Sequence, residues 1–216
     1  MKKSSGLNYL ILSIITASSL GIEILMAYFI EPFIFGNEIK SWTVSQTIIH
    51  WVVTCIIWGV ICYYVIRIAK KRYDFDIFQD AEKMSMLQWI VIFIAVILSL
   101  YLSYLDWDGI KIVKEFYSNG LPKFIFQYIY YCFETMIVTF ILVFGQKAFE
   151  EWFHKSNIPY GGILVALTWG VGHLFTKDIT TGIMTIISGL AFGSIYLLTN
   201  RDIKKTYLFL WMMFVL

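Results

Sequence analysis

Long apolar runs separated by short polar segments dominate the chain. A helix that crosses a membrane needs roughly 20 mostly apolar residues, and six runs meet that length. These six are about residues 8–30, 44–66, 86–105, 124–146, 159–176 and 180–199, and a shorter seventh covers Thr206 to Leu216. The seventh either crosses part of a bilayer or begins earlier, with Lys204 and Lys205 reaching to the interface. The pattern predicts an all-α protein, a polytopic transmembrane helical bundle of six to seven membrane helices.

Composition supports a membrane protein and excludes a soluble globular class. Of the 216 residues, 59% are hydrophobic and only 15% are charged. The polar loops are too short to bury a core of their own, so residues 1–216 form a single transmembrane domain in contact with the lipid bilayer. The segment from Met1 to Gly6 is typical of a signal peptide start, but the apolar run behind it is long enough to span. We therefore expect a retained first helix.

The basic residues alternate between the two sides of the predicted bundle. Twelve fall on the side of the N-terminus: Lys2, Lys3, Arg67, Lys70, Lys71, Arg72, Lys83, Lys147, Lys155, Arg201, Lys204 and Lys205. Five fall on the opposite side: Lys40, Lys111, Lys114, Lys123 and Lys177. The positive-inside rule then predicts an N-terminus inside the cell and explains the net charge of +2 without a nucleic-acid partner. The compact, Ile-rich and Lys-rich chain suggests a multi-pass protein of a bacterial plasma membrane.

Small residues indicate where helices approach one another closely. Gly189 and Gly193 form a small-xxx-small pair, and Gly161 and Gly162 lie in the preceding apolar run, so close helix packing is expected there. Gly170 and Gly172, just before a histidine, leave room for a ligand or a bent backbone. The three cysteines all lie within apolar runs, which favours small core residues over disulfides.

Four ionisable side chains fall inside the apolar runs, where each needs a partner or a purpose: Glu23, His50, Glu134 and His173. Counted at about 1.5 Å per residue, all four lie in the outer half of the membrane. Two carboxylates and two imidazoles are donors that suit zinc. The structural alternative is that Glu23 pairs with His50, and Glu134 with His173, each pair satisfying its own charge.

A second pair of carboxylates, Glu150 and Glu151, resembles a catalytic pair more closely than Glu134 does. It lies between Lys147 and Lys155 at the predicted cytoplasmic interface, which favours the solvated end of an amphipathic helix. From the residues alone, the choice between Glu134 and this pair stays open.

The region from about 124 to 200 resembles the CPBP family of CAAX-prenyl-protease and bacteriocin-processing intramembrane metalloproteases. That family carries EExxxR on one helix, FxxxH on the next, and a later His followed by Asn. The stretch Trp169-Gly170-Val171-Gly172-His173 is similar to the second motif with Trp in place of Phe, and Gly193 to Tyr196 resembles the region behind it. The first motif reduces to Phe133-Glu134-Thr135, and the third has no counterpart between Lys205 and Leu216.

The resemblance implies a metalloendopeptidase that cleaves membrane-associated peptides or proteins. In such a site Glu134 is the general base or a ligand, His173 is a ligand of Zn²⁺, and His50 replaces the missing histidine of the third motif. The alternative within the family is a degenerate, non-enzymatic member that binds a membrane peptide, in bacteriocin immunity or as an accessory protein. A proton-coupled transporter also places Glu and His in a membrane, but internal repeats typical of that class are not visible.

Overall fold

The computed structural model describes residues 5–216, so Lys2 and Lys3 of the charge count lie outside the described residues. The described chain is a bundle of helices without strands, and five helices are long and apolar enough to cross a membrane. They confirm the predicted transmembrane helical bundle. The elements are α1 (Gly6–Leu25), α2 (Glu31–Phe35), α3 (Val44–Tyr73), α4 (Met86–Asp106), α5 (Lys111–Phe153), α6 (Tyr160–Val165), α7 (Val171–Thr176), α8 (Ile179–Leu198) and α9 (Ile203–Val215).

Two of the apolar helices, one of them long enough to span a membrane and one shorter than the predicted span 159–176, contain a π-helical turn. Residues Met26–Ile30 join α1 to α2 as a π turn, so that Gly6–Phe35 is one span of 30 residues. A second π turn, Ala166–Gly170, joins α6 to α7 in a shorter apolar helix, Tyr160–Thr176. Such turns hold one residue more than a regular helix needs and are frequent at functional sites.

Local side chains fix where α3 and α4 begin. The hydroxyl of Thr43 accepts from the backbone N–H of Gln46, while the Gln46 side chain accepts from the Thr43 N–H. Ser85 and Gln88 form the same reciprocal cap at α4. Each cap satisfies two backbone donors that a helix start leaves without partners.

The long helix α5 is the centre of the bundle. It runs for 43 residues but is bent at Gly120, whose φ of 69° and ψ of 164° are not helical, with Pro122 directly behind the bend. The polar segment between the apolar runs 86–105 and 124–146, which the sequence pattern predicts as a loop, is therefore helical from Lys111 to the bend. Beyond it, the stretch from Glu134 to Gln146 is buried almost without interruption because neighbours cover α5 on several sides.

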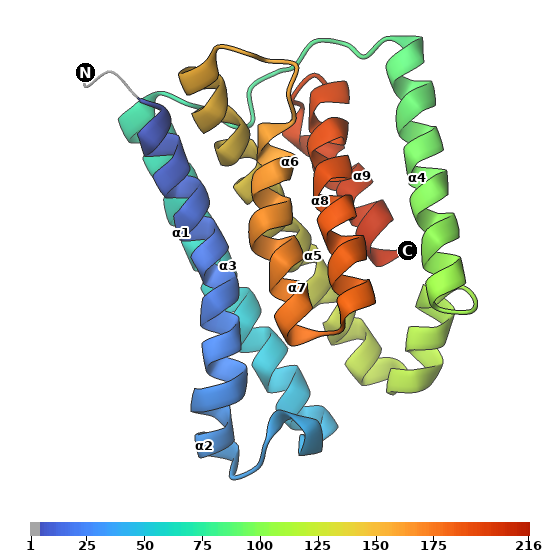
Figure 1. Ribbon diagram of the computed structural model, residues 1–216. Helices are drawn as coiled ribbons and strands as arrows, with labels where there is room; N and C mark the ends of the chain where they lie inside the picture. The colour runs from blue at the N-terminus through green and yellow to red at the C-terminus, as the bar shows by residue number, and fades with distance from the viewer. Residues whose placement is uncertain (1–4) are drawn as a thin grey trace.

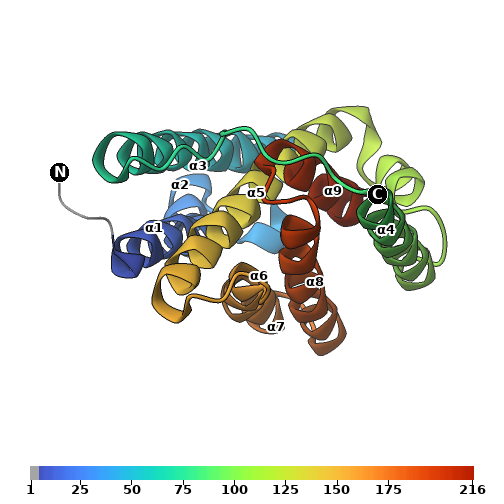
Figure 2. The same cartoon turned by 90° about the horizontal axis from the view of Figure 1, so that it is seen from above.

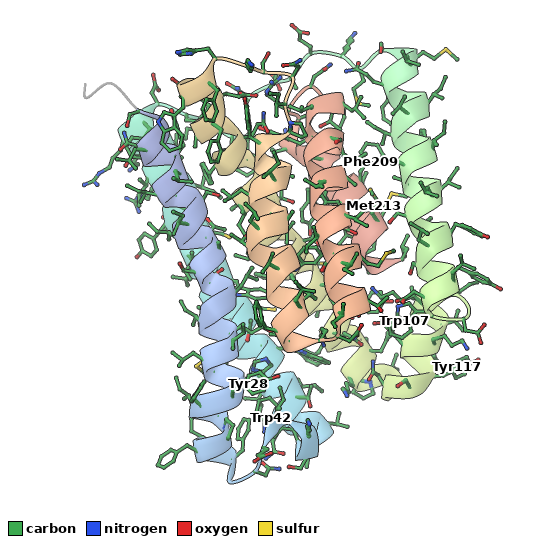
Figure 3. All side chains as sticks on the ribbon, viewed as in Figure 1. Tyr28, Trp42, Trp107, Tyr117, Phe209 and Met213 are labelled. Carbon is green, nitrogen blue, oxygen red and sulfur yellow. The ribbon has the colours of Figure 1, made fainter. Side chains whose placement is uncertain are left out.

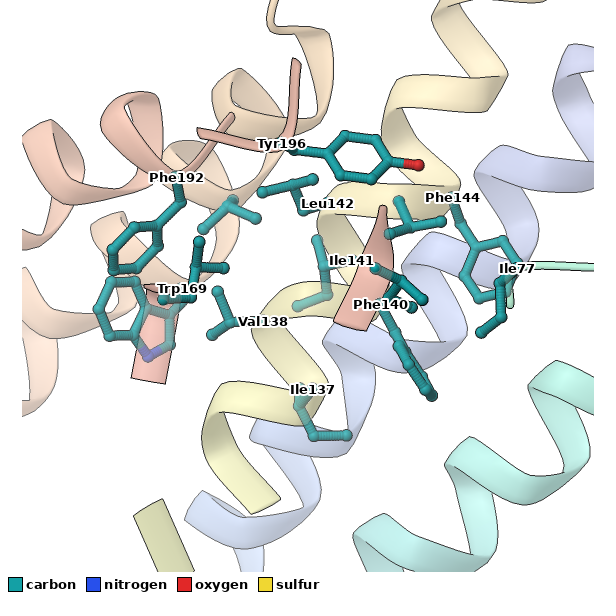
Figure 4. Packing of buried hydrophobic residues seen from close by; sticks show 14 of the residues in the cluster. Ile77, Ile137, Val138, Phe140, Ile141, Leu142, Phe144, Trp169, Phe192 and Tyr196 are labelled. Atoms are coloured by element: carbon teal, nitrogen blue, oxygen red, sulfur yellow. The ribbon is translucent and has the colours of Figure 1, made fainter. Parts of the chain in front are cut away.

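The other helices are arranged around α5 (Figures 1 and 2). Helices α1 and α3 pack on one side of it, α6, α7 and α8 on another, and α9 lies between α5 and α4. In the close view, Ile137, Ile141 and Phe144 of α5 form the middle of the hydrophobic core, with Trp169 and Phe192 beside them (Figure 4). Helix α4 has only 11% of its most apolar window buried, so its other faces are left for lipid.

Glycines allow the closest helix contacts, as the sequence predicted. A Cβ on Gly162 would lie 2.7 Å from the Cα of Gly193, and one on Gly189 would lie 2.7 Å from the backbone N of Ala166. Helices α6 and α8 therefore touch through their backbones. Gly170 also packs against backbone, with its Cβ position 2.9 Å from the Cα of Ile186, whereas Gly172 has no atom within 4 Å and does leave open space.

We call the end of the bundle where α1 begins the basic end, because Arg67, Lys147 and Arg201 lie there, and the other end the far end. Aromatic side chains surround the far end at Tyr28, Trp42, Trp107 and Tyr117 (Figure 3), as expected of a membrane–water interface. Helix α9 starts at the basic end and has 13 residues. At about 1.5 Å per residue it covers about 20 Å, less than the ~30 Å hydrocarbon core. It therefore crosses part of the thickness, one of the two expected outcomes (Figure 1).

Candidate functional site

Glu134 lies on the central helix, where it is held by a tryptophan. Its side chain is buried, with 7% of the residue exposed. The indole Nε1–H of Trp169 donates to Oε1 of Glu134 at 2.8 Å. Trp169 belongs to the π turn between α6 and α7, and its ring packs against Phe192 and Phe214. The carboxylate is thus fixed by a donor from a neighbouring helix, and no described residue bonds its second oxygen, Oε2.

The same tryptophan also orients His173. Nδ1 of His173 lies 2.8 Å from the backbone oxygen of Trp169, one turn earlier. Because a carbonyl oxygen only accepts, Nδ1 carries the hydrogen, and in a neutral ring Nε2 keeps a free lone pair. The imidazole also contacts the Trp169 ring edge to face, with 4.8 Å between the ring centres. His173 is partly exposed, and no described residue bonds its Nε2.

Glu134 and His173 do not satisfy each other. No hydrogen bond or ion pair within 4.0 Å joins them in the described chain, so they are not the closed structural pair that was one reading of the sequence. Trp169 lies between them and holds each by a different group. The site therefore presents two acid–base groups that each keep an unused atom.

His50 lies in a separate polar cluster at the start of α3. Its Nδ1–H donates to Oε2 of Glu31 at 2.6 Å, and its Nε2 lies 3.8 Å from Oε1 of Glu23. The same oxygen of Glu23 accepts a hydrogen bond of 2.6 Å from the hydroxyl of Tyr130 on α5. The expected pairing of Glu23 with His50 is present. The closer partner, Glu31, was not among the residues that the sequence singled out.

The π turn explains how two glutamates on one helix reach one histidine. Glu23 and Glu31 are eight residues apart, which in a regular α-helix places them about 80° apart around the axis. The π turn at Met26–Ile30 lies between them and absorbs one residue. The effective spacing becomes seven, or about 20° from perfect alignment, so both carboxylates face α3.

This geometry bears on the expected zinc site. Glu134, His173 and His50 are not gathered around one point, because His50 is held between Glu31 and Glu23. Within residues 5–216, no group of three or more His, Cys, Asp or Glu side chains is placed to hold a metal ion. The donor set therefore does not fit zinc as arranged, and zinc stays a prediction for measurement.

A third polar cluster lies at the far end of α5 and was missed from the sequence. Glu115 is 2% exposed and accepts hydrogen bonds from Tyr128, Tyr131 and Gln127 at 2.9, 2.8 and 3.1 Å. Asn119 donates in turn to Gln127 across the bend at Gly120. The cluster joins the two arms of bent α5 and is structural. Gln127, Tyr128 and Tyr131 at helical spacing were its only signal.

The carboxylates of Glu150 and Glu151 are used in structural contacts at the basic end. Glu150 is paired with Arg201, whose Nη2 lies 2.7 Å from Oε1, and also accepts from Gln146 at 2.8 Å. Glu151 pairs with Lys147 one turn earlier, at 2.7 Å. Glu150 thereby ties α5 to the α8–α9 loop. These contacts favour Glu134 as the carboxylate available for chemistry.

Comparisons of the chain with protein-family models, with curated proteins and with solved structures find no match. The class of protein is accordingly defined by the molecule itself: a helical bundle whose long apolar helices can span a membrane, with the ionisable side chains Glu134, His173 and His50 held inside it.

Proposed function

We propose that this protein is an intramembrane hydrolase that cleaves membrane-associated peptides or proteins, with Glu134 and His173 as its acid–base pair. The observation that carries the proposal is the double role of Trp169. Its indole holds one oxygen of Glu134, and its carbonyl fixes the tautomer of His173, so that Oε2 and Nε2 remain available. Purely structural groups at this depth would be expected to bond each other, as those around His50 do.

The chemistry needs both groups. In the proposed reaction, Nε2 of His173 takes a proton from a water molecule as the water oxygen attacks the peptide carbonyl. The carbon–nitrogen bond then breaks, and the leaving amine receives this proton from the protonated imidazole, while Oε2 of the Glu134 carboxylate accepts a hydrogen bond from the attacking water. The products are a carboxylic acid and an amine, so atoms balance with water as the only co-reactant. No metal is required for these steps, although the resemblance to the CPBP family implies one.

The full-length protein in lipid nanodiscs, incubated with a mixture of peptides from membrane proteins, tests the proposal. Mass spectrometry is expected to find new peptide ends with the unmodified protein. Glu134→Gln and His173→Asn are each expected to slow their formation by at least about 100-fold, because general acid–base catalysis contributes about 10²–10⁴-fold.

His154→Asn is the matched control. His154 is an exposed residue at the end of α5 with φ 53°, a conformation that Asn tolerates, so cleavage should be unchanged. A zinc chelator distinguishes a zinc-dependent reaction from one that uses Glu134 and His173 alone. Full inhibition, with recovery on added Zn²⁺, would establish the metalloenzyme that the resemblance implies, whereas no inhibition supports the metal-free pair. No cleavage by the unmodified protein would overturn both.

One observation favours the second candidate, a non-enzymatic protein that binds a membrane peptide. Glu134 is 7% exposed and one of its oxygens is already bonded, which restricts the approach of water and substrate. For such a protein, the same peptide mixture would yield peptides that are retained intact rather than cleaved. Retention that survives Glu134→Gln would separate this binding function from catalysis.

A further inference from the structure

An apolar groove of about 540 Å³ lies between α3 and α5, away from the acid–base site. Its walls include Trp51, Cys55, Gly59 and Tyr63 of α3, and Phe126 and Phe133 of α5. Gly59 lies in the middle of the α3 wall of the groove, opposite Phe133 of α5. A Cβ at that position would lie 3.3 Å from Cε1 of Phe133, so a larger residue there would reduce the space between the two walls.

The groove opens on the surface that faces the bilayer. Along its rim, Ile56, Val60 and Ile129 are 61%, 50% and 45% exposed. In a helix that crosses a membrane, apolar side chains exposed in this way face lipid chains. The groove is therefore accessible from within the membrane.

The length and lining of the groove suit an alkyl chain as its occupant. From Trp51 to Tyr63 it follows α3 for twelve residues, which is about 18 Å and somewhat more than half of the ~30 Å hydrocarbon core. Aliphatic and aromatic side chains line it along that length. An extended alkyl chain from one leaflet, which reaches about the middle of the core, matches this length and these walls.

Positive charge lies where the groove reaches the basic end. The guanidinium of Arg67 donates to the hydroxyl of Tyr63, which lines the groove, at 3.0 Å. Lys71 and Arg72 follow in the last turns of α3. Lys70 is neutralised by Asp76 at 2.6 Å, but in the described chain no carboxylate lies within ion-pair distance of Arg67, Lys71 or Arg72. Two unbalanced cations, Arg67 and Lys71, thus lie on the side of α3 that carries Tyr63, beside the end of an apolar groove, whereas Arg72 lies half a turn away from it.

We propose that this groove binds an anionic phospholipid, with one acyl chain between α3 and α5 and the phosphate against Arg67. The apolar walls select an alkyl chain, and the unpaired cations Arg67 and Lys71 select a headgroup with net negative charge. The Tyr63 hydroxyl connects the two parts, because it lines the groove and bonds Arg67. The site is independent of the acid–base pair and does not rest on the proposed hydrolysis.

Native mass spectrometry of the full-length protein tests this site. The protein is purified in a mild detergent and equilibrated with equal amounts of phosphatidylglycerol and phosphatidylcholine that carry identical acyl chains. We expect one phosphatidylglycerol to be retained in preference. Arg67→Gln should weaken that retention about fivefold, since a juxtamembrane cation contributes about that factor. Lys155→Gln, a basic residue of the same end but away from the groove, is the matched control and should leave retention unchanged.

A second set of variants tests the apolar part. Gly59→Leu and Val60→Trp both fill the groove, the first at its centre and the second from its exposed rim, and both should abolish retention of the lipid. The second variant keeps the test informative if the first does not fold, as judged by helical circular dichroism. Equal retention of the two lipids, no effect of Arg67→Gln, or a dimer that both groove variants dissociate would overturn the proposal.

Discussion

His50 and His173 lie in contrasting surroundings. His50 lies between two carboxylates, 2.6 Å from Glu31 and 3.8 Å from Glu23, and is 4% exposed. His173 has no carboxylate within that range. It donates to a backbone carbonyl and contacts an indole ring. Each ring nitrogen of His50 therefore faces a carboxylate, whereas Nε2 of His173 has no partner among the described residues.

The difference between the partners of His50 and those of His173 indicates which polar groups inside a membrane protein serve its stability. A group that is fully bonded by other helices contributes to stability and is unavailable for chemistry. A group that is oriented but left with an unused atom contributes less to stability and is available. The following changes test this division, from the largest expected effect on stability to the smallest.

Removing His50 is expected to have the largest effect. His50→Leu leaves the carboxylate of Glu31, which is 3% exposed, buried without its partner. Breaking a buried pair in this way costs about 3–5 kcal/mol, and we expect that loss in the free energy of unfolding measured in detergent micelles. In the double variant Glu31→Leu with His50→Leu, most of the loss should be recovered because no charge is stranded. A loss below about 1 kcal/mol for the single variant would show that the cluster is not part of the framework.

Removing the indole donor is expected to have an intermediate effect. Trp169→Phe keeps an aromatic ring in the core but deletes the N–H that bonds Glu134. Because a hydrogen bond to a charged group contributes about 1.5–3 kcal/mol, we expect a loss in that range and a further loss of peptide cleavage. The double variant with Glu134→Gln separates bonding from packing in a thermodynamic cycle. If Trp169→Phe costs the same in both backgrounds, the tryptophan contributes packing alone.

The exposed pair of Lys70 and Asp76 gives the smallest effect. The ammonium of Lys70, with help from the backbone N–H of Phe78, lowers the pKa of Asp76. A lowered pKa in the folded state contributes stability at pH values above the ordinary Asp value of about 3.9, and this contribution is lost as pH falls through the lowered value. Asp76→Asn should therefore lower the melting temperature slightly at pH 7 and not at pH 2. Added salt should shrink the difference at pH 7, whereas an effect of equal size in acid would contradict this assignment.

Most of the fold could be predicted from the sequence because hydrophobicity decides it. The apolar runs predicted the long apolar helices and the short final helix. The glycines of α6 and α8 predicted the close contact between these two helices. The first arm of α5 and the bend behind it were missed, since the polar segment between the apolar runs 86–105 and 124–146 was read as a loop. The helical arm before them is held by Glu115, whose partners come from beyond the bend.

Only part of the candidate site could be predicted from the sequence. Glu134 and His173 stood out because ionisable groups are costly in apolar runs, but the residue that joins them did not. Trp169 was interpreted as the aromatic position of a motif. No sequence pattern predicts that its indole N–H donates a hydrogen bond to Glu134. Glu31 was missed because it follows the first apolar run and precedes Pro32. Regular helical geometry also places it on a different face from Glu23, and a π turn is not predictable from spacing alone.

The π turn at Met26–Ile30 also makes this helix unusually tolerant of a change in length. In most membrane helices, deletion of one residue rotates everything beyond it by about 100° and turns core side chains toward lipid. Here the extra residue is already present, so its deletion converts the π turn into a regular turn and leaves Glu23 and Glu31 on the same face. We therefore expect the first span to keep the same helix faces with or without this residue. Helix α3 has no π turn, so a deletion there would rotate the residues beyond it.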